Sequence, residues 1–191
     1  MKIINKIKRL IKRNLHTYYI LYADMNELLE KAEKKLRPLP VGCELVKLTK
    51  DNMSLYKCKY HVDQMIQDEN EALAVVDNDE IIAWHYGTYR GKTSLFFRIK
   101  NCDFEHVEIL VDERYRRKGI ALHLLYHMVK NINSENIKKN KVGTCIKPDN
   151  IQSIKLHESI GFKISRKVRL WHKTIIKDGR FVYLNFPQYK I

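Results

Sequence analysis

The sequence predicts an α/β protein of the α+β kind, in which a mixed, mostly antiparallel central sheet is flanked by helices. Three observations predict this class. Short apolar strands come first and are paired by tight turns, strand and helix then alternate, and a hairpin closes the chain. With 191 residues, of which 45% are hydrophobic and 30% charged, the chain is long enough for one domain and an extension.

The first forty residues form a stretch of their own. Residues 18–22 are typical of a short strand, and residues 26–36 are typical of a helix that two prolines end. We therefore expect an N-terminal extension over 1–40, which begins with a basic amphipathic helix, and a single domain over 41–191.

The elements of the domain follow from apolar alternation and from capping residues. A helix is expected to begin at Thr49 or Asp51, and a tight turn at 77–80 joins two strands. The strands are expected at 44–48, 73–76, 81–89, 94–99, 104–111, 142–146, 164–175 and 180–186. Further helices are expected at 61–71, at 119–132 and from 149 or 150 to 160, where Gly161 ends the last one.

A strand, a basic turn and a helix follow one another directly between residues 107 and 132. Unpaired N–H groups and the dipole of a helix N-terminus attract anions, and a glycine lets the backbone approach a ligand closely. The apolar residues of the helix recur at helical spacing, at Ala121, Leu124, Leu125, Met128, Val129 and Ile132. The segment therefore predicts a pyrophosphate site, with a plain basic surface turn as the alternative.

Two blocks of sequence carry a resemblance to a known family. Arg116-x-x-Gly119-x-Ala121 resembles the Arg/Gln-x-x-Gly-x-Gly/Ala acetyl-CoA motif of the GCN5-related N-acetyltransferases (GNAT). The second block is similar to that family's Asn-x-x-Ala/Ser-x-x-Leu-Tyr-Glu-x-x-Gly-Phe segment, and it holds Asn150, Ser153, Leu156, His157, Glu158, Gly161 and Phe162. The resemblance covers 42–186. It implies a GNAT-like domain, acetyl-CoA as the acyl donor without a metal, and direct transfer to an amine in a ternary complex.

The resemblance also implies which residues hold acetyl-CoA. The main chain of Leu110 and Val111 is expected to meet the oxyanion and the pantetheine arm. Asn150 and Ser153 suit hydrogen bonds to pantetheine or to the nucleotide end, with helix capping as the alternative. The phosphates are expected on the turn, at Arg116, Arg117, Lys118, Gly119, Ile120 and Ala121.

A primary amine has a pKa near about 10, so a base or a water chain must remove its proton before it attacks. Glu105 and Glu108, near the end of the central strand, are the first candidates, and His106 is a third. Glu105 stands where some histone-modifying members of the family place their base glutamate. Glu108 is expected on the other side of the pleat unless a bulge intervenes. A solvent-facing or loop-capping role is the alternative for each.

The family usually protonates the departing thiolate with a tyrosine, and His157 stands at that position here. Imidazolium, with an ordinary pKa of about 6.5, is a competent acid toward a thiolate whose conjugate acid lies near about 8.5. Otherwise water, Tyr115, Tyr126 or Tyr189 supplies the proton, and His157 is a surface histidine of its helix.

Aromatic residues lie on a strand beside the expected cleft. Alternation puts Trp84 and Tyr86 on one face and His85 on the other. The rings of Trp84 and Tyr86 suit stacking on a sugar or a base, which makes them the candidate substrate contacts. Filling the core is the alternative.

The formal net charge of +14 favours an anionic partner such as coenzyme A, nucleic acid, anionic lipid or a nucleotide-linked substrate. Compositional drift is the alternative. Residues 1–13 hold six basic residues around an isoleucine-rich stripe. Such a helix rests on an anionic membrane surface, or packs on its own domain or on a second subunit. Monomer and homodimer both stay open.

The sequence has no run of eighteen apolar residues, and lysines and arginines up to Arg13 interrupt its first apolar residues, so we expect no signal peptide there. Its four cysteines are far apart and lack metal-ligand spacing. We therefore expect a cytoplasmic protein with buried thiols, membrane-peripheral only through residues 1–13.

The sequence thus predicts an acetyl-CoA-dependent N-acetyltransferase that acts on a small amine, with an amino sugar, nucleotide-linked or free, as the preferred acceptor. A protein or peptide N-acetyltransferase is one alternative. A non-catalytic CoA-responsive or nucleic-acid-binding module is the other, although no nucleic-acid motif supports it.

Overall fold

The computed structural model describes residues 15–59, 66, 71–89, 101–132, 136–177 and 180–185, and only the backbone at 15, 170–177 and 180–185. Within these residues, eight strands form one sheet in the order β2-β3-β4-β5-β6-β1-β7-β8. The strands are β1 (Leu15–Asp24), β2 (Cys43–Lys47), β3 (Glu71–Asp77), β4 (Glu80–Tyr89), β5 (Phe104–Val111), β6 (Lys141–Ile146), β7 (Lys163–Lys177) and β8 (Arg180–Asn185). Only β5 and β6 run parallel, which confirms the predicted mixed, mostly antiparallel sheet.

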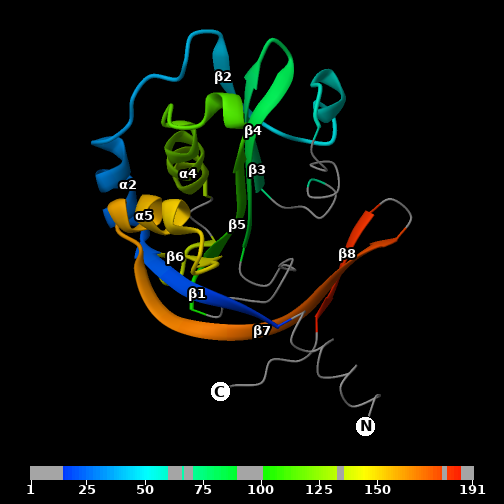
Figure 1. The fold of residues 1–191 in the computed structure, drawn as a ribbon. Helices are drawn as coiled ribbons and strands as arrows, with labels where there is room; N and C mark the ends of the chain where they lie inside the picture. Colours follow the sequence, from blue (N-terminus) through cyan, green and yellow to red (C-terminus); the bar gives the residue numbers. More distant parts are fainter. Residues whose placement is uncertain are drawn as a thin grey trace.

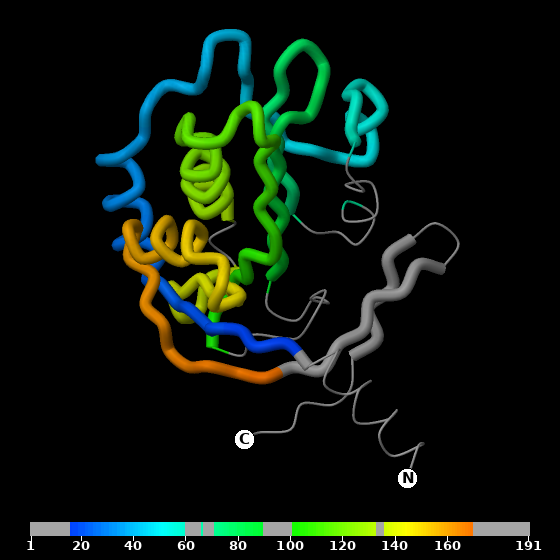
Figure 2. Tube along the Cα trace, in the orientation of Figure 1, coloured from blue at the N-terminus to red at the C-terminus, as the bar shows by residue number. Residues whose placement is uncertain are grey.

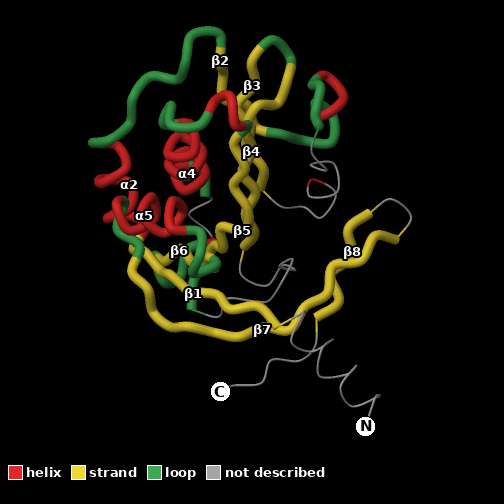
Figure 3. The backbone as a smooth tube through the Cα atoms, in the orientation of Figure 1, coloured by secondary structure: helices red, strands yellow, loops and turns green. Residues whose placement is uncertain are grey.

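Three described α-helices cover one face of the sheet, which curves around them (Figures 1 and 3). They are α2 (Met25–Glu33), α4 (Ile120–Lys130) and α5 (Ile151–Ser159), close to their predicted ranges. The apolar stripe predicted for α4 is buried between the helices and the sheet, except for Ala121, which is partly exposed. A second apolar cluster, which includes Leu48, Ile66, Trp84 and Tyr86, covers the opposite face of β3 and β4. The sheet is therefore buried on both faces at its centre.

The N-terminal strand β1 is an inner strand of the sheet. It pairs antiparallel with β6 on one side and with β7 on the other, so the start of the described chain lies beside a strand that is far from it in sequence (Figure 2). The side chains of Ile20 and Leu21 are fully buried there. A part of the predicted extension thus contributes directly to the sheet, while the division of the chain at residue 40 stays a prediction.

The predicted turn at 77–80 is confirmed as a two-residue hairpin between β3 and β4. Asn78 and Asp79 have φ values of 48° and 62°, the left-handed pair that such a turn requires. The helix predicted from Thr49 or Asp51 is wrong, because only a 3-10 turn at Met53–Leu55 forms there. Thr49 and Asn52 exchange side-chain hydrogen bonds with each other's backbone N–H, at 3.3 and 2.8 Å, which favours a turn over a helix.

Several predicted elements lie outside the described residues. They are the helix at 1–13, most of the helix at 61–71, the strand at 94–99 and the turn of the closing hairpin. Glu71, at the end of the second of these, belongs to β3. No helix of the described chain combines the length and the apolar character needed to cross a membrane.

Candidate functional site

The one parallel pair among the described strands separates partway along its length. β5 and β6 pair from Phe104 opposite Val142 to His106 opposite Thr144. Beyond that point β5 keeps β4 as its partner and β6 keeps β1. The edge of β5 at 107–111 that faces β6 has no strand partner in the described chain, and we call this gap the β5–β6 seam. Backbone N–H and C=O groups on such an edge can bond to an extended ligand with amide groups.

A turn at the outer end of the seam presents free amides. We call residues 116–121 the anion turn. None of the N–H groups of residues 117–121 donates to an acceptor in the described chain, whereas Arg116 donates to Glu113. Gly119 has φ +81° and leads into α4, and a Cβ added to it would meet no atom within 4 Å. Free N–H groups, open space and the positive end of the α4 dipole together fit a phosphate group.

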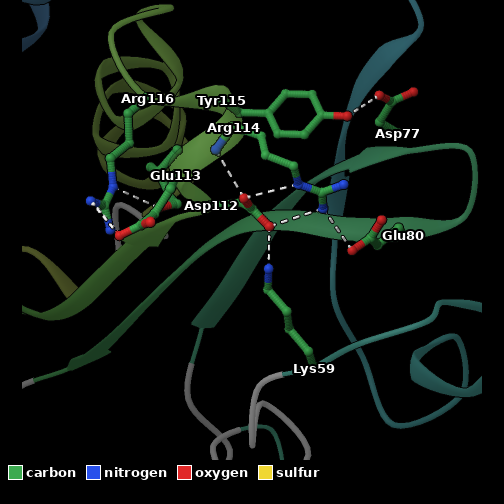
Figure 4. Close-up of polar contacts among 9 residues, drawn as sticks. Lys59, Asp77, Glu80, Asp112, Glu113, Arg114, Tyr115 and Arg116 are labelled. Carbon is green, nitrogen blue, oxygen red and sulfur yellow. Dashed lines mark hydrogen bonds and ion pairs between the residues drawn. The ribbon is translucent and has the colours of Figure 1, made fainter.

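A cluster of charged residues fixes the anion turn to the sheet (Figure 4). Asp112 directly follows β5, and its buried carboxylate accepts hydrogen bonds from Arg114 N (3.0 Å), Arg114 Nε (3.2 Å) and Lys59 Nζ. Arg114 also reaches Glu80 at the start of β4. The bonds from Arg114 and then Lys59 hold the pKa of Asp112 well below its usual range. Asp112 therefore stays charged and ties the turn to β4 and to the loop that holds Lys59.

The basic residues of this region divide into two groups. Arg114 is bound to Asp112 and Glu80, and Arg116 pairs with Glu113 at 3.1 Å and donates to the Val111 carbonyl at 3.3 Å. Arg117 and Lys118, in contrast, are exposed and reach no carboxylate of the described chain, although Lys118 Nζ lies over the Tyr115 ring, 4.9 Å from its centre. They are the cations of the anion turn that stay available to a ligand.

A bulge in β5 changes which way its glutamates point. Thr88 pairs with Glu105 and Tyr86 pairs with Glu108, although the register shifts between Tyr86 and Gly87. Tyr86 and Thr88 share one face of β4, so Glu105 and Glu108 share that face too. Glu108 is expected on the other side of the pleat unless a bulge intervenes, and the bulge is present, so the two glutamates lie on the same face.

The two glutamates differ in their surroundings. Glu108 is partly buried beside Tyr86, and this burial raises the pKa of its carboxyl group. Glu105 is buried more deeply. The pKa of Cys145 is raised to about 12, first by burial of the thiol and then by the negative charge of Glu105. A carboxylate with a raised pKa and partial access to solvent suits proton transfer, which favours Glu108 over Glu105.

Trp84 and Tyr86 lie in the apolar cluster on the face of the sheet opposite α4. Their side chains are 3% and 1% exposed, and their rings stack with centroids 6.3 Å apart. Both residues thus fill the core, as the alternative interpretation held. Tyr86 nonetheless lies beside Glu108, and the indole N–H of Trp84 has no acceptor among the described residues. Their contact with a substrate stays a prediction.

The helix that follows β6 positions His157, Asn150 and Ser153. The Asn150 side chain accepts from Ser153 N at 3.2 Å, so Asn150 caps α5 as the alternative predicted. His157 lies one helical turn after Ser153 and donates from Nδ1 to the Ser153 carbonyl at 2.7 Å. It is not a surface residue, because its side chain is 3% exposed. Burial lowers its pKa to about 4, so the ring is neutral at pH 7.

Two of the three alternative proton donors are bound elsewhere. The hydroxyl of Tyr115 donates to Asp77 at 2.5 Å, and this hydrogen bond raises its pKa. The hydroxyl of Tyr126 donates to Glu33 at 3.1 Å and accepts from Lys130. Tyr189 lies outside the described residues.

The sequence did not predict two contacts, one between His85 and His106 and one between Lys59 and Asp112. His106 Nδ1 lies 2.9 Å from His85 Nε2 across β4 and β5. The sequence named both histidines, but only the strand register brings them together. Lys59 and Asp112 are 53 residues apart, and no local pattern signals their contact. No cluster of three or more His, Cys, Asp or Glu side chains suited to a metal occurs in the described part of the chain.

Comparison with known proteins identifies one family by its sequence model. The model of the acetyltransferase (GNAT) family matches residues 55–162. A Drosophila protein of known structure has a TM-score of 0.55 at 14% identity and covers 88% of this chain and 56% of its own. A tandem GNAT protein from the clavulanic acid biosynthesis pathway has a TM-score of 0.58 at 12% identity and covers 81% and 52%. Among curated proteins, none matches the sequence.

A third solved structure is an aminoglycoside N-acetyltransferase, AAC(6')-Iy, in complex with CoA. It has a TM-score of 0.51 at 17% identity, with 68% of this chain and 98% of that chain covered. The chain spans only about half the length of the first two structures. At these identities the likeness shows the fold.

Proposed function

Because the chain belongs to the acetyltransferase (GNAT) family, whose members are N-acetyltransferases, we propose that it transfers the acetyl group of acetyl-CoA to a primary amine of a small molecule. The observation that carries the proposal is the anion turn, with its free N–H groups, at the outer end of the β5–β6 seam. Acetyl-CoA fits both features, because its pyrophosphate can bind the anion turn and its amide-containing pantetheine arm can bond to the edge of β5 that has no strand partner in the described chain.

In this proposal the phosphates of acetyl-CoA lie against the N–H groups of residues 117–121. Arg117 and Lys118 supply free positive charge, and Arg116 closes the turn through Glu113. The pantetheine arm follows the edge of β5 at Leu110 and Val111, where a main-chain N–H meets the developing oxyanion. Ser153, near the start of α5, and Asn150 border the same space, with Asn150 also serving as the cap.

The proposed chemistry needs a base and an acid. Glu108 removes the first proton from the ammonium form of the substrate, and its raised pKa supports this role over that of the more deeply buried Glu105. His157 gives a proton to the departing thiolate. Two observations support this role. His157 lies on α5, which follows β6, and the hydroxyl groups of Tyr115 and Tyr126 already donate to Asp77 and Glu33.

An amino sugar, free or nucleotide-linked, is the proposed acceptor. The support is the net charge of +14, which attracts a phosphorylated molecule such as a nucleotide-linked sugar. The structural likeness to an aminoglycoside N-acetyltransferase is compatible with this class of amine. A cytoplasmic location, next to the acetyl-CoA supply, belongs to the same proposal.

A panel of amines tests the proposal. Purified protein is mixed with acetyl-CoA and, in turn, with glucosamine, a nucleotide-linked amino sugar, an aminoglycoside and a lysine-containing peptide, and the free thiol is followed with a chromogenic disulfide. Turnover with the sugars and not with the peptide is expected. Turnover with the peptide alone would make the chain a protein acetyltransferase, and CoA binding without any turnover would make it a binding module.

A further inference from the structure

Two buried histidines at the inner end of the β5–β6 seam each have one nitrogen without a partner. The side chains of His106 and His157 are 1% and 3% exposed. Nε2 of each ring has no hydrogen-bond partner in the described chain. A buried polar group without a hydrogen bond is unfavourable, so such groups in native proteins usually meet a ligand or an ordered water.

The hydrogen bonds of His157 determine which nitrogen carries the proton. Nδ1 lies 2.7 Å from the Ser153 carbonyl and 3.4 Å from the Ser153 hydroxyl. A carbonyl oxygen can only accept, so the shorter contact requires the hydrogen on Nδ1. Nε2 of the neutral ring then carries a lone pair and is an acceptor.

The same reasoning applies to His106 through its neighbour on β4. His85 Nδ1 lies 3.4 Å from the Leu124 carbonyl, so it is the protonated nitrogen and His85 Nε2 is an acceptor. His106 Nδ1, 2.9 Å from His85 Nε2, must therefore donate to it. Nε2 of His106 is left with a lone pair, so His85 is the positioning residue that holds His106 in this tautomer.

His106 lies at the inner end of the seam, away from the anion turn, and His157 shares a ring neighbour with it. His106 is the last residue of β5 that pairs with β6, and both imidazoles pack on the ring of Phe162, at centroid distances of 6.0 and 4.9 Å. From Val111 to His106 is five residues of strand, about 17 Å. An extended arm that starts at the turn and follows the seam reaches these two rings with its far end.

We propose that Nε2 of His157 is a proton shuttle, which first accepts the second proton of the reacting amine and then gives it to the departing thiolate. This inference rests on the proposed acetyl transfer. Nε2 of His106, whose ring packs on the same Phe162, offers a second acceptor. Two acceptors suit an amine, because an amine has more than one N–H bond to donate.

The steps balance. The ammonium substrate loses one proton to Glu108 and then to solvent. The neutral amine attacks the thioester carbon, a C–N bond forms, and the nitrogen becomes positively charged. His157 Nε2 takes a proton from that nitrogen. The C–S bond then breaks, the electron pair leaves on sulfur, and the proton on Nε2 moves to it. The products are the amide and the free thiol, and His157 returns to its neutral form.

Burial supports this order of events. A ring whose pKa is lowered to about 4 holds almost no proton at pH 7, so His157 must receive one before it can donate one. A simple acid would instead need a ring that is protonated beforehand. The proton shuttle and the simple acid therefore predict opposite pH dependences for the rescue of a His157 variant by added imidazole.

The test uses His157→Ala with added imidazole, and His127→Ala, on the partly buried side of α4, as the matched control. His157→Ala is expected to lower kcat about 100-fold, with CoA affinity by calorimetry within threefold, while His127→Ala stays near wild type. Rescue, normalised to the wild-type rate at each pH, is expected to rise from pH 6 to pH 8, since only neutral imidazole accepts a proton. Rescue that falls over this range would identify a simple acid and overturn the shuttle.

Two further readouts extend the test, and the second needs neither a variant nor a substrate. His157→Tyr can donate but not accept near neutral pH, so its kcat is expected to stay within threefold of that of His157→Ala, and a tenfold recovery would overturn the shuttle. Nitrogen NMR of the wild-type protein at pH 7 is expected to show hydrogen on Nδ1 of His157 and none on Nε2, and the reverse tautomer would exclude it. Wild-type protein without turnover on any amine would instead refute the proposed function.

Discussion

At the scale of single residues, Gly119 and Arg117 both adopt left-handed backbone conformations within the anion turn, with φ values of +81° and +65°. A glycine adopts this conformation freely, whereas an arginine does so at a cost. In this turn the left-handed conformation costs little at Gly119 and is unfavourable at Arg117. The exposed cation of Arg117 is a reason to retain it, because the charge is free to meet a phosphate.

Gly119→Glu is expected to weaken CoA binding at least tenfold, or about 1.4 kcal/mol, because the carboxylate occupies the open space and repels phosphate. Calorimetric titration measures the effect. Gly119→Ala is the control for backbone strain alone and is expected to lose less affinity. Unchanged CoA affinity in a folded Gly119→Glu protein would refute the phosphate site.

Arg117→Gly is expected to raise the free energy of unfolding by about 0.5–1 kcal/mol, because glycine relieves the left-handed strain at φ +65°. The same change removes a free cation and is expected to weaken CoA binding severalfold. Lys118→Gly removes an equal charge without the positive φ and is the matched control. Urea denaturation that finds both variants less stable than wild type would contradict the strain argument.

Acid should destabilise the protein through its buried histidines. The pKa of His157 is lowered to about 4 in the folded chain, mainly by burial, and those of His85 and His106 are lowered too. The unfolded chain therefore binds more protons below pH 6.5, and stability falls as the pH drops from there toward the folded pKa. His157 alone accounts for about 2 kcal/mol of this loss at pH 5.

Urea melts of the wild type and of His157→Leu at pH 7 and pH 5 measure this contribution. The variant is expected to lose about 2 kcal/mol less between the two pH values than the wild type. The Asp112 carboxylate stays ionised in this range, because Arg114 and Lys59 hold its pKa low. Equal losses in both proteins would mean that His157 is not buried in its neutral form.

At the scale of elements, local patterns predicted what depends on local physics. The stripe of α4, the Asn150 cap of α5 and the turn at Asn78 and Asp79 each follow from residues within one turn of chain. The bulge at residue 107 could not be predicted, because an apolar strand shows no sign of one extra residue. That bulge decides the direction of Glu108, so the site was the less predictable part.

The position of β1 could not be predicted either, since strand order depends on contacts between distant parts of the chain. β1 lies between β6 and β7, which places a stretch of the expected extension inside the sheet. The contact of Lys59 with Asp112 is non-local in the same way.

Truncation separates residues 1–13 from β1. Deleting 1–13 is expected to leave acetyl transfer near normal and to lower either binding to anionic vesicles or dimer content. Deleting 1–24 also removes Ile20 and Leu21, whose burial is worth about 1.5–3 kcal/mol each, and is expected to unfold the protein. Circular dichroism and kcat report the outcome. A tenfold loss of kcat in a stable protein that lacks 1–13 would place that segment in the active site.

At the scale of the whole molecule, the sheet forms the core of the protein and, where β5 separates from β6, the proposed acetyl-CoA site. Apolar clusters cover β3 and β4 on both faces, and the separation of β5 from β6 leaves an edge of β5 without a strand partner in the described chain, between the anion turn and His106. The charge of +14 far exceeds what one coenzyme needs, and the exposed lysines and arginines of β7, such as Lys167 and Arg169, contribute to it. The family accounts for the turn and the seam, but not for this surplus.

The most direct measurement of the central claim follows both products of a single reaction. Acetyl-CoA and an amino sugar are incubated with the protein, and mass spectrometry quantifies the acetylated sugar while a thiol reagent quantifies free CoA. The account predicts equal amounts of the two, formed at a rate that falls at least tenfold with Gly119→Glu at limiting acetyl-CoA. Free thiol without an acetylated amine, for any amine of the panel, would contradict it.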